Sequence, residues 1–109
     1  MANTYKILGQ ISPSATTETI LYTVPSAKST VCSSLSVCNR GSVQSTFRIS
    51  LSQGGAATTS KDYMYYDVTL AANDTFIATI GVTLATTDVI RVYAGNANLS
   101  FQVFGTEIS

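Results

Sequence analysis

The chain contains no histidine and no tryptophan, only two cysteines, and few charges: six basic and six acidic side chains among 109 residues. Histidine is the side chain that most often transfers protons near neutral pH, and it is the commonest metal ligand. Without it, a serine or threonine nucleophile would need a lysine or the chain terminus as its base. We therefore predict that the protein is not an enzyme, has no small-molecule substrate and needs no cofactor.

The charges that are present are too scattered to form a patch. The basic residues lie far apart along the chain: Lys6, Lys28, Arg40, Arg48, Lys61 and Arg91. Proteins that follow a phosphate backbone do so with clustered lysine and arginine. No segment approaches the roughly 18 consecutive apolar residues of a membrane helix, and the N-terminus lacks the pattern of a signal peptide. We expect no direct contact with nucleic acid or membrane, and synthesis in a cytosol.

The two cysteines are not placed to bond to each other. Cys32 and Cys38 lie six residues apart in one predicted strand, which at about 3.3 Å per residue separates their Cα atoms by roughly 20 Å. A disulfide needs Cα atoms within about 7 Å. Two thiols without histidine also make a poor zinc site. Asp62 and Asp67 are expected on opposite faces of a strand, so they do not converge on a metal either, and we predict no metal site.

What the sequence does contain is alternation of apolar with Ser and Thr residues, which predicts β-strands. Phe47, Ile49 and Leu51 form one such apolar face, and no stripe of helical period competes with it. Turn-forming residues divide the chain into about eight predicted strands: 5–11, 18–24, 30–38, 45–52, 62–70, 74–80, 88–94 and 98–108. A chain of 109 residues has the usual size of one domain.

Short strands without helices to cover a parallel sheet indicate an all-β protein, an antiparallel β-sandwich of the immunoglobulin-like or jelly-roll kind. The Cys, Trp, Cys core of true immunoglobulin domains is absent. Any immunoglobulin likeness is therefore one of architecture only, and the strand order stays open between the two folds. The first ten residues are expected either to join the sandwich or to form an extended N-terminal arm.

The segment richest in tyrosine is the strand predicted at 62–70. Strict alternation places four apolar side chains on one face: Met64, Tyr66, Val68 and Leu70. It leaves Tyr63 and Tyr65 on the opposite face. Tyrosine covers apolar area while keeping a hydroxyl for a partner, and it is enriched at interfaces. Core packing, a subunit interface and sugar binding are the three interpretations of this strand. This strand and the N-terminal arm together supply our candidate interface residues: Tyr5, Lys6, Ile7, Tyr63, Tyr65 and Tyr66.

Nearly the whole chain resembles a known family. The stretches that carry the resemblance are Tyr5–Gln10, Pro13–Thr17, Leu21–Pro25, Val37–Gly41, Thr46–Ile49, Asp62–Asp67, Ala72–Thr75, Asp88–Ala94 and Phe101–Ile108. They look like those of small virion proteins of tailed bacteriophages, of the kind carried by cyanophages. The resemblance implies a structural protein of the virion, made in the host bacterial cytoplasm, and it supplies no catalytic motif.

The leading hypothesis is a capsid decoration, or cement, protein that binds the major capsid protein on the outside of the shell, with a homotrimer as its expected state. A polar but nearly uncharged surface suits packing against copies or a shell. Two alternatives remain at this stage. One is a module of the tail, neck or baseplate, and the other is a carbohydrate-binding receptor module that uses the tyrosine strand.

Overall fold

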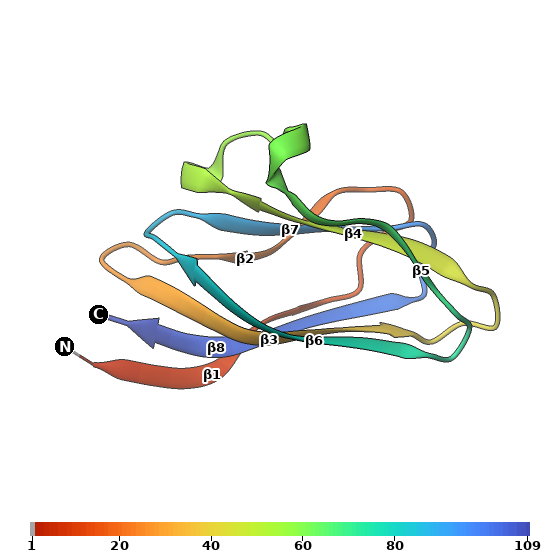
Figure 1. The fold of residues 1–109 in the computed structure, drawn as a ribbon, viewed down its shortest axis with the longest axis horizontal. Helices are drawn as coiled ribbons and strands as arrows, with labels where there is room; N and C mark the ends of the chain where they lie inside the picture. The colour runs from red at the N-terminus through yellow and green to blue at the C-terminus, as the bar shows by residue number, and fades with distance from the viewer. Residues whose placement is uncertain (1) are drawn as a thin grey trace.

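The computed structural model describes residues 2–109 and shows eight strands and two short 3₁₀ turns (Figure 1). The elements are β1 (Asn3–Ile11), β2 (Thr19–Thr23), β3 (Ser29–Asn39), β4 (Ser45–Ser52), η1 (Gln53–Gly55), η2 (Ser60–Asp62), β5 (Tyr63–Leu70), β6 (Thr75–Leu84), β7 (Val89–Ala94) and β8 (Leu99–Ile108). Every predicted strand is present. The largest boundary difference is in β6, which continues through Gly81 to Leu84.

The strands form two four-stranded antiparallel sheets packed face to face. Sheet I has the order β1-β8-β3-β6 and sheet II the order β2-β7-β4-β5. The first strand pairs with the last, the second with the seventh, the third with the sixth and the fourth with the fifth. The chain is thus one long hairpin wound up on itself, which is the topology of an eight-stranded jelly roll. The β-sandwich prediction is confirmed, and the jelly roll is the alternative that the strand order supports.

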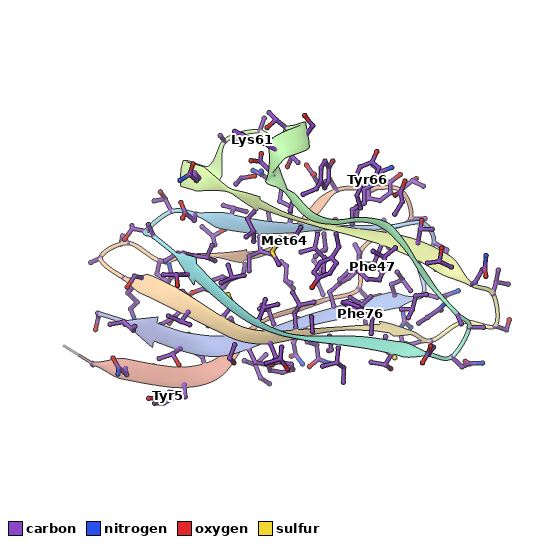
Figure 2. All side chains as sticks on the ribbon, in the orientation of Figure 1. Tyr5, Phe47, Lys61, Met64, Tyr66 and Phe76 are labelled. Atoms are coloured by element: carbon purple, nitrogen blue, oxygen red, sulfur yellow. The ribbon has the colours of Figure 1, made fainter. Side chains whose placement is uncertain are left out.

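The core lies between the two sheets, where alternate positions of each strand point inward. Phe47 of β4 is at its centre. Its ring centroid lies 5.3 Å from that of Phe76 of β6 and 6.2 Å from that of Phe101 of β8. Figure 2 shows Phe47 and Phe76 between the layers, Tyr66 outside sheet II and Tyr5 outside sheet I. The alternation seen in the sequence around Phe47 and Phe101 therefore gives the correct inward face for β4 and β8.

Each of the four strands at the sheet edges carries at least one β-bulge. The register leaves an extra residue at Leu8 in β1, at Leu21 in β2 and at Ile80–Gly81 in β6. β5 has two such irregularities. A bulge bends an edge strand and interrupts its row of backbone donors and acceptors, which protects the edge from pairing with another chain. A bulge also moves the side chains beyond it to the other face of the sheet.

The N-terminal segment belongs to the sandwich rather than to an arm. Residues 3–11 pair with β8 from Asn3 opposite Ile108 to Ile11 opposite Phe101, and Ala2 and Ser109 exchange backbone hydrogen bonds of 3.2 and 3.0 Å. The prediction of an extended arm over residues 1–10 is therefore wrong for residues 2–10, because pairing satisfies their backbone groups. Met1 lies outside the described residues.

Cys32 and Cys38 are both free thiols, as the strand geometry predicted. Strict alternation would place residues 32 and 38 on the same face of β3, but the β3–β8 register has an extra residue at Ser33. Cys32 consequently points into the core with Leu35 and is fully buried, whereas Cys38 is only half-buried. Burial raises the pKa of the Cys32 thiol to about 11, so this thiol is protonated and unreactive near neutral pH.

Candidate interaction surfaces

The two bulges in β5 decide which tyrosines face outward. Between the pairs Phe47–Val68 and Ile49–Tyr65, β5 contains two residues where β4 contains one. Tyr65 therefore points inward, and its ring centroid lies 5.2 Å from that of Phe76 and 6.3 Å from that of Phe47. Tyr66 points outward and is 57% exposed. The prediction that Tyr65 is the outward aromatic and Tyr66 the inward one is thus wrong, since strict alternation does not hold through a bulge.

Asp67 holds the larger bulge in place. Its backbone has a positive φ of 52°, a conformation that aspartate tolerates better than most residues. Its carboxylate accepts hydrogen bonds from Arg48 Nε at 2.6 Å and Nη2 at 3.3 Å. The hydrogen bond from Arg48 is the main reason that the pKa of Asp67 lies below its usual value. Arg48 stands on β4 opposite the bulge, so the ion pair stabilises the switch of face.

Arg48 also organises the aromatic residues on the outside of sheet II. Its guanidinium lies 4.3 Å from the ring centroid of Tyr66 and 4.4 Å from that of Tyr93. Tyr63 meets Tyr66 edge to face, with 4.8 Å between ring centroids. We call Arg48, Tyr63, Tyr66, Asp67 and Tyr93 the tyrosine cluster. A cation held between two rings is attracted to both, by about 0.5–1 kcal/mol for each contact at an exposed site, and so favours this arrangement of the rings.

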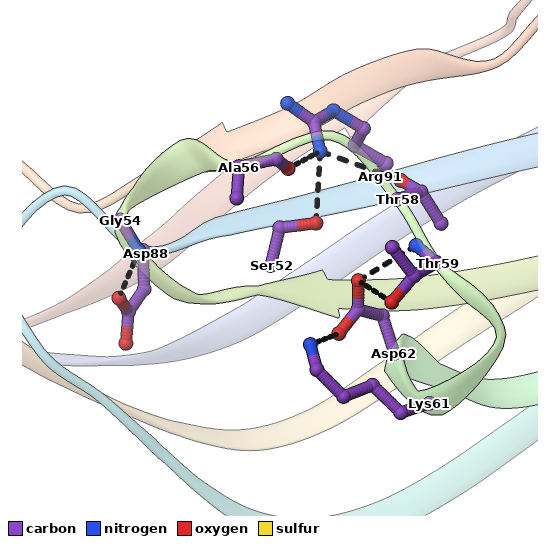
Figure 3. Close-up of polar contacts among 9 residues, drawn as sticks. All are labelled: Ser52, Gly54, Ala56, Thr58, Thr59, Lys61, Asp62, Asp88 and Arg91. Carbon is purple, nitrogen blue, oxygen red and sulfur yellow. Dashed lines mark hydrogen bonds and ion pairs between the residues drawn. The ribbon is translucent and has the colours of Figure 1, made fainter.

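The loop of residues 53–62 folds over the same outer face of sheet II (Figures 1 and 3). Arg91 of β7 is its anchor: Nη1 donates to Ser52 Oγ at 2.8 Å, Ala56 O at 2.8 Å and Thr58 Oγ1 at 3.3 Å, and Nη2 donates to Gly55 O at 3.2 Å. The half-buried Arg91 therefore ties three positions of the loop, Gly55, Ala56 and Thr58, to the end of β4. At the start of the loop, Gly54 N donates to Asp88 Oδ1 at 2.9 Å.

Asp62 closes the second turn of this loop. Its carboxylate accepts a hydrogen bond from Thr59 N at 2.9 Å, which is the backbone contact of a capping box. It also accepts one from Lys61 Nζ at 2.9 Å. The contact with Lys61, followed by that with Thr59, holds the pKa of Asp62 below its usual value. The loop and the tyrosine cluster enclose an open groove of 420 Å³ lined by Thr58, Thr59, Ser60, Tyr63 and Tyr66.

The outer face of sheet I has a different character. Register and exposure assign it the following side chains: Tyr5, Ile7 and Gln10 from β1; Ser100, Gln102, Phe104, Thr106 and Ile108 from β8; Val31, Ser34, Ser36 and Cys38 from β3; and Thr75, Ile77, Thr79 and Thr83 from β6. None of these is charged. Tyr5 is 78% and Ile77 69% exposed. We call this surface the neutral face.

The six predicted interface residues therefore do not form one site. Tyr5 and Ile7 lie on the neutral face of sheet I, while Tyr63 and Tyr66 lie on the opposite side of the molecule. Lys6 and Tyr65 turn toward the space between the sheets. Arg48, Tyr93 and the hydroxyl-bearing residues 58–60 were not predicted from the sequence to belong to an interaction surface. The run of Thr58, Thr59 and Ser60 just before the tyrosines was the available signal for the groove.

A polar cluster joins the two sheets at the end where the chain termini meet. Glu107 of β8 is only 3% exposed, and its carboxylate accepts a hydrogen bond from Tyr22 Oη of sheet II at 2.6 Å. Tyr22 Oη also bonds Thr30 Oγ1 at 2.8 Å. Lys6 Nζ lies 2.9 Å and Lys28 Nζ 3.7 Å from Glu107 Oε1. Every side-chain oxygen and nitrogen that is buried in the described part of the chain has such a partner.

We predict that this cluster makes the protein sensitive to acid. The hydrogen bond from Tyr22, supported by Lys6 and Lys28, lowers the pKa of Glu107 in the folded state. Because the unfolded chain binds the proton more tightly, the stabilisation is complete above the ordinary carboxyl pKa of about 4.3 and is lost as the pH falls toward the folded pKa. Urea unfolding at a series of pH values measures this loss of unfolding free energy.

Glu107→Gln isolates this contribution from those of the other carboxylates. It should cost about 2 kcal/mol of unfolding free energy at neutral pH, and the difference from the wild-type protein should shrink in acid. A difference that stays constant with pH would show that the charge of Glu107 contributes nothing.

Among residues 2–109 no group of three or more Cys, Asp or Glu side chains is placed to hold a metal ion. The helical segments of that part of the chain are single turns, and none is long and apolar enough to cross a membrane. What the two outer faces offer is contact area: a neutral face on sheet I and an aromatic groove on sheet II.

These features define a jelly-roll β-sandwich with two unlike outer faces. No family model matches the chain, and no curated protein matches its sequence. Among solved structures, it is similar to a chain in the structure of infectious bursal disease virus, Gx strain, with a TM-score of 0.52 and 9% sequence identity. The alignment covers 97% of this chain and 31% of the viral chain, so this protein spans about a third of that chain's length. The likeness is one of fold.

Proposed function

We propose that the protein is a structural component of a virion, a decoration protein that binds the outer surface of the shell. The observation that carries the proposal is the neutral face of sheet I. A charged partner would lose its hydration there without gaining an opposite charge. A neutral protein surface, such as a shell or a copy of this chain, would lose nothing comparable and would bury the exposed rings and aliphatic side chains.

The bulged edges support contact through a face rather than through strand addition. All four edge strands carry a register irregularity, which disfavours extension of either sheet by another chain. The jelly-roll topology and the likeness to a chain of a virus structure agree with a virion role. A homotrimer on the major capsid protein is the proposed arrangement, and the alternative within the same class is a module of the tail, neck or baseplate.

The test inserts a charge into the neutral face. Ile77→Glu places a carboxylate at a site that is 69% exposed in the free protein, so folding should be unaffected. Burying that unpaired charge against the shell should lower the number of copies per particle at least about tenfold. A quantitative gel of purified particles, with the coat protein as the internal standard, measures the copies.

Ile20→Glu is the matched control, because Ile20 is 49% exposed on sheet II. It should be incorporated at the wild-type level. Equal incorporation of both variants would rule out the neutral face as the attachment surface, and absence of the wild-type protein from particles would rule out the virion role. A copy number close to that of the coat protein indicates shell decoration, and a few copies indicate the tail.

A further inference from the structure

The groove on sheet II has two aromatic walls at right angles. Tyr63 and Tyr66 meet with an interplanar angle of 79°, and the guanidinium of Arg48 lies over the Tyr66 ring, 4.3 Å from its centroid. Such a corner offers apolar ring surface together with the phenolic hydroxyls. Such a surface can pack against the C–H groups on one face of a hydroxylated saturated ring, since a tyrosine side chain combines an apolar body with a polar tip.

The opposite wall consists of hydroxyl groups that are already oriented. Thr58 Oγ1 accepts a hydrogen bond from Arg91 at 3.3 Å, and Thr59 Oγ1 donates to Asp62 Oδ2 at 3.3 Å. Ser60 completes the wall. The Thr59 oxygen keeps lone pairs to accept from a ligand. Because Arg91 and Asp62 already hold the loop in place, ligand binding would lose little free energy to ordering the loop.

Two of the three basic side chains near the groove are paired with carboxylates. Lys61 pairs with Asp62 at 2.9 Å, and Arg48 pairs with Asp67 at 2.6 Å. None of the five lining residues is an acidic or basic residue of the Asp, Glu, Lys or Arg type. Arg91 has no carboxylate partner in the described part of the chain, but its Nη1 and Nη2 already donate to four neutral oxygens of the protein. No lining side chain supplies a counter-charge to an ionic ligand, so we expect the recognised group to be neutral. The volume of 420 Å³ lies within the usual range of about 300–1,000 Å³ for small-ligand sites.

We propose that this groove binds a neutral sugar ring, with its C–H face on Tyr66 and its hydroxyls on Thr59 and Ser60. The proposal is independent of the role in the virion, because it concerns the face opposite to the neutral face. It adds a glycan-binding activity to a protein whose other side would be attached to a shell.

The experiment is a titration of the intact protein, followed by amide NMR, with methyl glucoside, methyl mannoside and methyl galactoside in turn. At least one should give saturable shifts confined to residues 58–66, with a dissociation constant on the order of 1 mM, as expected for so small a ligand. Tyr66→Ala should weaken binding at least about tenfold. Titration with a neutral oligosaccharide of the same sugar tells whether the site takes a glycan chain or a free sugar. If the oligosaccharide binds more tightly than the single ring, the site is for a glycan chain; if both bind equally, it is for a free sugar.

Two further variants keep the result interpretable. Tyr66→Phe retains the ring and its contact with Arg48, so it should fold normally and keep most of the affinity. Tyr5→Ala removes an exposed tyrosine from the neutral face and should leave binding unchanged. The proposal is overturned if no glycoside gives saturable shifts at about 100 mM, far above the expected constant, or if folded Tyr66→Ala binds as the wild-type protein does.

Discussion

Gly105→Ala is expected to lower the free energy of unfolding by about 3 kcal/mol or more, enough to leave much of the protein unfolded at moderate temperature. Gly105 lies in β8 between β1 and β3. A methyl group added there would overlap the carbonyl oxygen of Val31 and would lie 3.0 Å from Cys32 Cα. Both obstacles are backbone atoms of a central strand, which cannot move aside as a flexible side chain can. Urea denaturation followed by circular dichroism measures the loss.

Gly81→Ala is the matched control for this substitution. Gly81 also lies in a strand of sheet I, but an added Cβ would meet nothing within 4 Å. We expect this variant to be neutral or slightly stabilised, because alanine restricts the unfolded chain more than glycine does. If Gly105→Ala proved as stable as Gly81→Ala, the close approach of β3 to β8 would be wrong.

Tyr65→Ala should cost about 3 kcal/mol, whereas Tyr66→Ala, one residue away, should cost less than about 1 kcal/mol. Tyr65 packs against Phe47 and Phe76 in the core, and its removal leaves a cavity. Tyr66 lies on the surface over Arg48. Urea denaturation of the two variants under the same conditions provides the comparison. The opposite order of stabilities would contradict the β5 bulges and restore the face assignment that strict alternation predicts.

The contrast between these two tyrosines shows where sequence reasoning stops. The strands around Phe47 and Phe101 were predictable because alternation and turn residues are local signals. The direction of Tyr65 was not, because it depends on a bulge that Asp67 and Arg48 stabilise across two strands. Bulges at Leu8 in β1 and Ser33 in β3 interrupt strict alternation in the same way.

The choice between jelly roll and immunoglobulin architecture was also beyond the sequence. It rests on pairings such as β1 with β8, whose partners are separated by nearly the whole chain. The groove was hidden for a related reason: Arg91, which anchors residues 55–58, lies more than thirty positions further along the chain. Alternation within one strand carries no information about either arrangement.

The wound hairpin also sets the order in which the molecule can acquire its structure. β4 and β5 are the nearest of the nested partners, joined by the loop of residues 53–62, whereas β1 and β8 meet only when Asn3 reaches Ile108. Each outer strand pair closes a longer loop than the pair inside it. The conformational entropy of that loop is lost before the contacts between the paired strands can stabilise the structure. Such non-local topologies fold in milliseconds to seconds rather than microseconds. The terminal strands, including the Tyr5 and Ile7 part of the neutral face, would be the last to form, so a nascent chain could not complete the neutral face before its final strand was made.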